Sequence, residues 1–192
     1  MLLKTAVALV KNGTVARKAN IFIDKGSSFS HIATKFAKEL CAKPHGVKTV
    51  NINAFEGATS TNNYLVGSVI IVTGEGEIVV DTLIRDITVA PIYRRKWANC
   101  LRSTHITTLQ LADDFSQDNF PVHILIVMDS VWQFLKPGTV SGYLRAQASS
   151  LGYVLSGRLS SLTNGAEAAQ KVTQCFASSL QCFASTIMLL IS

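Results

Sequence analysis

The residues best suited to chemistry lie in one short stretch, where an apolar run ends in an acid. Residues 21–30 read IFIDKGSSFS. A carboxylate positioned by a strand end, beside small hydroxyl residues, can serve as a general acid or base. The tripeptide Asp24-Lys25-Gly26 also fits an ordinary turn, in which the acid bonds the backbone. We take Asp24 as the candidate catalytic residue, with Gly26 and Ser27 supporting its carboxylate.

Three further stretches accompany this one in the order typical of one protein family. The stretch LQLADD at 109–114 is similar to the family's Leu-x-Leu-Ala-Asp, and ILIVMDSVW at 124–132 to its Ile-Leu-Ile-Gly-x-Asp-x-x-Trp. LGYVLSG at 151–157 is similar to its closing Gly-Trp-Val-Leu-Ser-Gly. Over residues 2–160 the chain therefore resembles the retropepsin-like aspartic protease domain of BEL/Pao-type retrotransposon polyproteins, a relative of the retroviral proteases.

The resemblance implies a mostly β fold, a closed retropepsin-like (acid protease) β-barrel protomer with one or two short helices. It assigns residues 1–160 to the protease domain and leaves residues 161–192 as an unmatched C-terminal tail. We expect a helix at Gly165–Leu180 within that tail. The apolar end of the tail could instead seek a membrane, but Ser, Thr and Gln interrupt it throughout, which favours a packed helix.

The implied activity is that of an aspartic endopeptidase that hydrolyses the polyprotein of a retroelement. Because one chain carries one such motif, the resemblance implies a homodimer in which two copies of Asp24 meet and share a proton. It implies extended peptide substrates and neither a metal nor an organic cofactor. A β-hairpin flap over the substrate would lie at Ala54–Thr59, with Phe55, Glu56 and Gly57 as flap residues and Gly57 near the tip.

Two departures from the family pattern bear on activity. Lys25 stands where retroviral proteases carry Ser or Thr, whose hydroxyl bonds across the dimer axis, and two Lys25 side chains near one axis would repel. Val127 stands where the family has Gly, so we expect a steric conflict with the catalytic loop. The alternative function is therefore a catalytically inactive, protease-like module for dimerisation or peptide binding.

Other groupings of reactive residues are interpreted as structural. Cys41, His45, Cys100 and His105 could form a zinc set, but the long gap between the two pairs is unusual. The run 93–97, YRRKW, mixes cations and aromatics as nucleic-acid-binding proteins do, yet a solvated loop is the simpler interpretation. The acids of 113–118 fit an acidic loop better than a metal site. Asp129 is expected to cap a helix beginning at Ser130.

The elements that must position these residues are mainly short apolar runs bounded by turn residues. One amphipathic helix is predicted at Ser30–Leu40, where apolar residues follow helical spacing, and a second, short helix at Ser130–Leu135. The predicted strands are Leu3–Val10, Val15–Ile23, Thr49–Ala54, Leu65–Thr73, Ile78–Ile84, Ile87–Ile92, Thr104–Leu111 and Val122–Val127.

Composition excludes several classes of protein. Of the 192 residues 48% are hydrophobic, which excludes a disordered chain, and the 4 Cys are too few for a disulfide-dense secreted scaffold. The net charge is +6, but successive blocks of the sequence alternate between positive and negative charge. The charge therefore does not by itself indicate a nucleic-acid-binding protein. We find no signal-peptide pattern and no uninterrupted apolar span, so we expect a cytoplasmic or otherwise intracellular protein without membrane or nucleic-acid partners.

Overall fold

The computed structural model describes residues 2–53, 59–86, 89–94, 106, 108–140 and 144–157. Strands dominate this part of the chain, with one short α-helix and one turn of 3₁₀-helix. The strands are β1 Thr5–Asn12, β2 Val15–Ile23, β3 His31–Ala33, β4 Gly46–Asn53, β5 Thr59–Thr73, β6 Gly76–Arg85, β7 Ile92–Tyr93, β8 Asn119–Phe120, β9 Ile124–Ile126, β10 Leu135–Val140, β11 Leu144–Ser149 and β12 Val154–Gly157. The helices are α1 Thr34–Glu39 and η1 Val131–Gln133.

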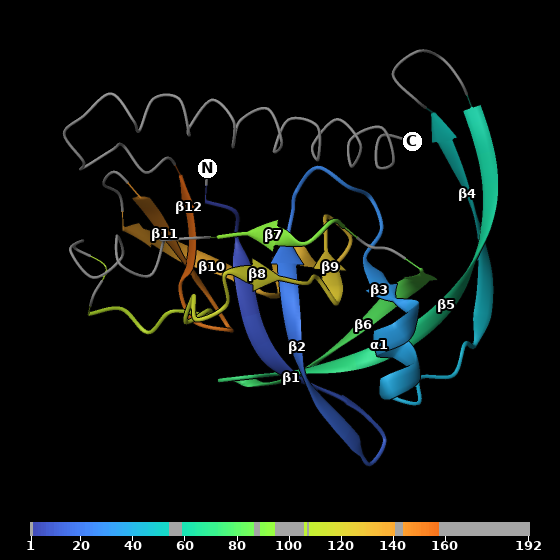
Figure 1. Ribbon diagram of the computed structural model, residues 1–192, viewed down its shortest axis with the longest axis horizontal. Coiled ribbons are helices and arrows are strands. Elements are labelled where there is room, and N and C mark those ends of the chain that lie inside the picture. Colours follow the sequence, from blue (N-terminus) through green and yellow to red (C-terminus); the bar gives the residue numbers. More distant parts are fainter. Residues whose placement is uncertain are drawn as a thin grey trace.

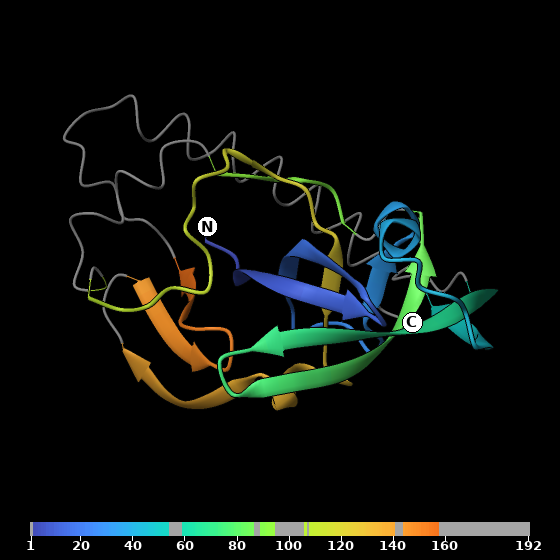
Figure 2. The ribbon, with the colours of Figure 1, turned by 90° about the horizontal axis from the view of Figure 1, so that it is seen from below.

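The main sheet closes into a barrel (Figures 1 and 2). Its strand order is β1-β2-β9-β3-β6-β5-β4, and an additional pairing of β1 with β5 joins the ends of the first six strands. Strand β4 continues outside the barrel as the partner of β5. A three-stranded sheet, β10-β11-β12, and the pair β7-β8 lie beside it. The prediction of a mostly β, closed barrel with few helices is thus confirmed in outline.

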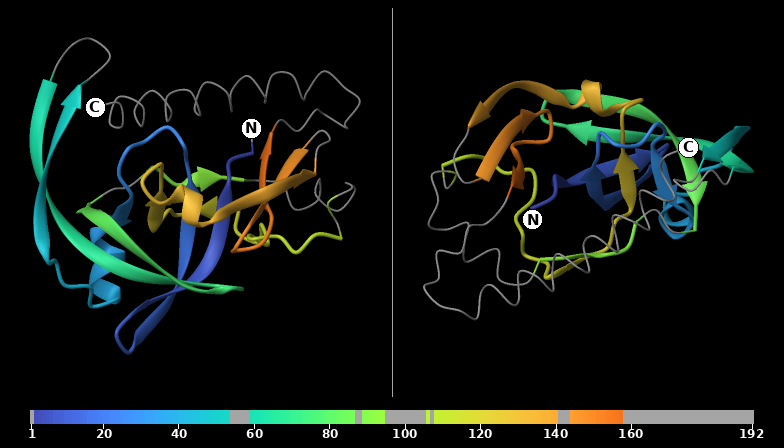
Figure 3. Two further views of the ribbon diagram at one scale, coloured as in Figure 1. Left: turned by 180° about the vertical axis from the view of Figure 1, so that it is seen from behind. Right: turned by 90° about the horizontal axis from the view of Figure 1, so that it is seen from above.

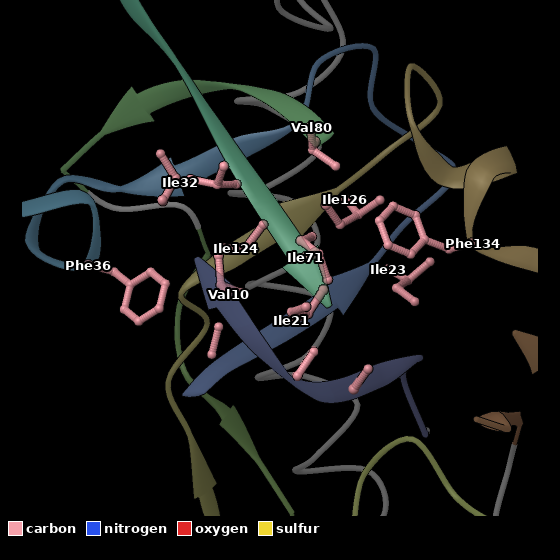
Figure 4. Close-up of a cluster of buried hydrophobic side chains, with 14 of the residues drawn as sticks. Val10, Ile21, Ile23, Ile32, Phe36, Ile71, Val80, Ile124, Ile126 and Phe134 are labelled. Atoms are coloured by element: carbon pink, nitrogen blue, oxygen red, sulfur yellow. The ribbon is translucent and has the colours of Figure 1, made fainter. Parts of the chain in front are cut away.

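The barrel interior is filled by branched aliphatic side chains (Figure 4). Each strand presents alternate residues inward, and β2 is fully buried over its last five positions, where strands flank it on both sides. The largest fully buried members of this core include Ile21, Ile32, Ile71, Ile124 and Ile126. Burying one such side chain contributes about 1.5–3 kcal/mol, so these residues stabilise the closed barrel.

Strand β9 is inserted between β2 and β3, two strands that follow each other in sequence. It runs parallel to β2, pairing Ile124 with Ile21, and antiparallel to β3, pairing Ile124 with Ile32. The loop of residues 24–30, which joins β2 to β3, must therefore pass over the end of β9. This arrangement ties the candidate catalytic loop to a strand about 100 residues further along the chain.

The first predicted helix begins later than expected. Residues His31–Ala33 of the predicted span Ser30–Leu40 form β3, and α1 starts only at Thr34. Helical periodicity over residues 31–33 is outweighed by backbone hydrogen bonds, because β3 pairs with β6 on one side and β9 on the other. The second predicted helix, Ser130–Leu135, is a single 3₁₀ turn, and Leu135 already belongs to β10.

Most predicted strands are present with shifted ends, but two are not. The strand predicted at Ile87–Ile92 is limited, in its described part, to the start of β7 at Ile92. The described part of Thr104–Leu111 contains turns and one isolated bridge, from Leu111 to Tyr153. Strands β10, β11 and β12 were not predicted, because their charged and polar residues hide the apolar alternation. The predicted helix Gly165–Leu180 and the tail 161–192 lie outside the described residues.

A buried ion pair joins the barrel to the segment that precedes β8. Arg94 and Asp113 pair directly, and both side chains are almost fully buried. Asp113 also accepts hydrogen bonds from the Thr5 hydroxyl at 2.6 Å and the Phe115 N–H at 3.0 Å. The guanidinium lies 4.1 Å from the ring centre of Phe120. The interpretation of Arg94 as a residue of a solvated loop is therefore wrong. Asp113 does lie outside the regular elements, as expected of a loop residue, but it is buried.

We predict that Asp113→Asn lowers the free energy of unfolding by about 3–5 kcal/mol, because it leaves the Arg94 charge buried without its counter-ion. The exposed Asp118, a few residues away, provides the control. Asp118→Asn should change stability by less than about 0.5 kcal/mol. Urea denaturation of the three proteins measures the difference, and equal losses in both variants would contradict a structural role for the pair.

Candidate active site

Asp24 is the first residue beyond β2, and the loop that follows folds back onto its carboxylate. The Asp24 N–H donates to the Ile126 carbonyl at 3.0 Å, which continues the pairing of β2 with β9. The Gly26 N–H donates to one carboxylate oxygen at 3.0 Å, and the Ser27 hydroxyl lies 3.5 Å from the other. The structure therefore brings Asp24, Gly26 and Ser27 together, with the carboxylate half-exposed at the barrel end.

Gly26 has a steric reason to be glycine. A Cβ atom at this position would lie 3.3 Å and 3.4 Å from the two carboxylate oxygens of Asp24, closer than most such contacts in proteins. Absence of a side chain lets the Gly26 N–H approach the carboxylate and keeps its oxygens open to solvent. Ser27 is buried, and its carbonyl accepts from the Met128 N–H at 3.1 Å. The loop is thus held to the chain that follows β9.

A second set of bonds fixes the far end of the loop. Asp129 accepts from the Ser30 N–H at 2.8 Å and from the Ser30 hydroxyl at 2.6 Å. The Ser30 oxygen in turn accepts from the Val127 N–H at 3.1 Å. Asp129 is structural, as expected, but the predicted cap is wrong, since η1 has no side-chain cap. Sequence inspection missed Ser30, whose partner is 99 residues away.

The two departures from the family pattern have definite places in the structure. Val127 is fully buried in a cluster with Phe22, Phe120 and Leu125, so the expected steric conflict does not arise. The Lys25 ammonium lies over the exposed ring of Trp132, 4.6 Å from its centre. This cation–π contact directs Lys25 along the surface of its own chain, toward η1.

The long hairpin of β4 and β5 projects from the end of the barrel that carries the Asp24 loop (Figures 1 and 3). At its base Phe29, from that loop, packs against a small cluster around Val50 and Leu83. The Lys48 ammonium lies 3.8 Å from the centre of the Phe29 ring. The predicted flap span Ala54–Thr59 is thus bracketed by paired strands.

Several predicted site residues cannot be placed. The flap residues Phe55, Glu56 and Gly57 lie outside the described residues, as do Cys100 and His105 of the possible zinc set. Within the described part of the chain, no group of three or more His, Cys, Asp and Glu residues is arranged to hold a metal ion.

Comparison with known proteins adds no family assignment. No protein-family model matches this chain, and no curated protein matches it. Among the described helices, neither is long and apolar enough to cross a membrane. The interpretation of the site consequently depends on its own geometry.

We predict that Ser30→Ala destabilises the protein by about 2–3 kcal/mol, because it removes two buried hydrogen bonds and leaves Asp129 short of a donor. Ser28, two residues earlier, is exposed and serves as the matched control, with an expected change below about 0.5 kcal/mol. Thermal and urea unfolding measure both variants. A Ser30→Ala protein as stable as the Ser28→Ala protein would show that the bonds to Asp129 do not anchor the loop.

His31, the residue after Ser30, is expected to make the stability of the fold sensitive to acid. His31 is buried, and its Nδ1 has no hydrogen-bond partner among the described residues. Burial, with repulsion from Arg85, lowers the pKa of His31 to about 4, while Asp129 opposes the shift. The unfolded chain, with a His pKa of 6.5, therefore binds this proton first as the pH falls.

Stability contributed by neutral His31 is present above pH 6.5 and is lost between pH 6.5 and about 4, by up to about 3 kcal/mol. We predict a smaller loss over this interval in His31→Gln than in the wild type. His45→Gln, at an exposed histidine, is the control and should keep the wild-type dependence. Urea titrations at pH 7, 5.5 and 4 measure the effect, and parallel curves for all three proteins would refute it.

Proposed function

We propose that this chain is an aspartic endopeptidase of a retroelement, which cleaves its polyprotein as a homodimer with one Asp24 from each copy. The observation that supports the proposal is the state of the Asp24 carboxylate. It lies at a strand end, oriented by the Gly26 N–H and approached by the Ser27 hydroxyl, yet remains half-exposed. Such a group is held in position and still accessible to water and a peptide.

Two other acids, the buried Asp113 and the exposed Asp129, are engaged in structural contacts. Both oxygens of Asp129 accept from Ser30, and Asp113 is occupied by Arg94, Thr5 and Phe115. Neither is available as a partner for Asp24. General acid and general base catalysis at one peptide bond requires a second carboxyl group, so we assign it to Asp24 of a second copy.

The proposed reaction uses both carboxyl groups with one shared proton. The ionised Asp24 takes a proton from a water molecule, whose oxygen attacks the peptide carbonyl carbon. The protonated Asp24 of the partner donates its proton to the carbonyl oxygen, which forms a neutral tetrahedral diol. Collapse of the diol breaks the C–N bond as the amine nitrogen is protonated, and the carboxyl group of the new C-terminus forms.

The hairpin β4–β5 would close over the peptide.

A second candidate function is favoured by Lys25. An ammonium group beside each Asp24 opposes the approach of two copies, because the two Lys25 side chains repel each other. In this alternative the chain is a catalytically inactive, protease-like module that dimerises or binds peptides. The position of Lys25 over Trp132 in its own chain weakens that objection, because it draws the charge toward η1.

We predict that the wild-type protein cleaves members of a peptide library between pH 4 and 7 and that Asp24→Asn reduces the rate at least about 1,000-fold. Asp86→Asn, at an exposed acid after β6, should retain the wild-type rate. Mass spectrometry of the digests gives the rates. Because each site needs two copies, specific activity should also fall on dilution below the dimer dissociation constant.

Circular dichroism and analytical ultracentrifugation establish that each variant is folded and dimeric. Absence of cleavage by a folded, dimeric wild-type protein would reject the endopeptidase and leave the binding module. Cleavage that survives Asp24→Asn would place the activity on another residue.

A further inference from the structure

The N-terminal segment adjoins β12 through the bridge between Leu2 and Gly157 (Figure 1). In this segment Lys4 lies close enough to Lys25, Arg145 and Asp24 for their charges to act on it. Lys4 adjoins the catalytic loop, because its carbonyl accepts from the Ile23 N–H at 2.8 Å. Its ammonium donates to the side-chain oxygen of Gln147 at 3.3 Å. Arg145 is two residues before Gln147 on β11, so both side chains occupy one face of that strand. Lys25 completes this basic cluster.

The basic cluster has a surplus of positive charge, since Asp24 is the acid whose charge acts on Lys4. Neither Lys4 nor Arg145 forms an ion pair with a described residue. Lys4 is half-buried, and burial, with repulsion from Lys25 and Arg145, lowers its pKa, while Asp24 partly offsets the effect. A half-buried ammonium near two other cations is destabilised, and an anion placed among them would relieve that cost.

The donors of the cluster suit a single carboxylate. Lys4 and Arg145 supply charged N–H groups, and Gln147, whose oxygen already accepts from Lys4, has its amide nitrogen left to donate. A peptide bound at Asp24 would place some of its side chains next to the basic cluster. An acidic side chain there could accept hydrogen bonds from these donors and offset their positive charge.

We propose that Lys4, Gln147 and Arg145 form a subsite for an acidic side chain, Asp or Glu, of the peptide that Asp24 cleaves. This inference rests on the proposed function, since it assigns the substrate class of the same site. It makes the enzyme selective for sequences with an acid close to the cleaved bond.

The test compares peptides that differ in one charge. The peptide cut most rapidly in the Asp24-dependent screen is resynthesised with Glu, and separately with Gln, at each position flanking the cut. Wild-type kcat/KM should favour Glu over Gln about tenfold at one position, the value of one charge-assisted hydrogen bond. Arg145→Gln and Lys4→Met should each remove most of this preference, whereas Arg17→Gln, at an exposed cation on β2, should retain it.

A binding measurement separates this inference from the proposed function. Fluorescence anisotropy records the affinity of Asp24→Asn protein, alone and combined with Arg145→Gln, for a labelled Glu-Ala repeat peptide and its Gln-Ala counterpart. If the wild type cleaves nothing, preferential binding of the Glu peptide that Arg145→Gln abolishes would still support the subsite. Cleavage without preference for Glu, or a preference unchanged in both the Lys4 and Arg145 variants, would overturn it. Tight binding of single-stranded RNA with no selectivity among the peptides would overturn it as well.

Discussion

The insertion of β9 between β2 and β3 is the constraint on which the rest of the structure depends. Three short segments of isoleucine-rich chain meet there, and Ile124 pairs with both Ile21 and Ile32. A strand in that position closes the barrel core and forces the intervening loop to cross its end. Hydrogen bonds from Ser30 to Asp129 then fix the crossing. Loss of this contact would affect the fold and the candidate site together.

The same constraint separates the acids of the chain into two groups. Asp113 and Asp129 each accept several hydrogen bonds, which stabilises the fold. Their carboxylate oxygens are therefore already occupied and do not take part in the proposed chemistry. Asp24 lies one residue beyond the buried end of β2, where the loop supplies a donor to one oxygen and a longer contact to the other. Hydrogen bonding thus commits the first two acids to structure and leaves Asp24 with a looser set of contacts.

Positively charged side chains surround the candidate site at Asp24. Lys25 contacts Trp132, and Lys4 contacts Gln147, so both ammonium groups near Asp24 have neutral partners. If the site is a protease, these cations shape which peptides bind near the reacting carboxyl groups. If it is inactive, they explain why the two carboxyl groups do not share a proton. Both outcomes follow from one feature, the surplus of cations around a single half-exposed acid.

Local sequence was sufficient for the hairpin of β1 and β2, for most of β5 and β6, and for the placement of Asp24 beside Gly26 and Ser27, because short-range patterns and neighbours decide them. Tertiary structure decided the rest. Residues 31–33 became a strand because two distant strands supplied hydrogen bonds, and Arg94 and Asp113 became core residues because each neutralises the other. Partners such as Ser30 and Asp129 are far apart in sequence, so no local pattern connects them.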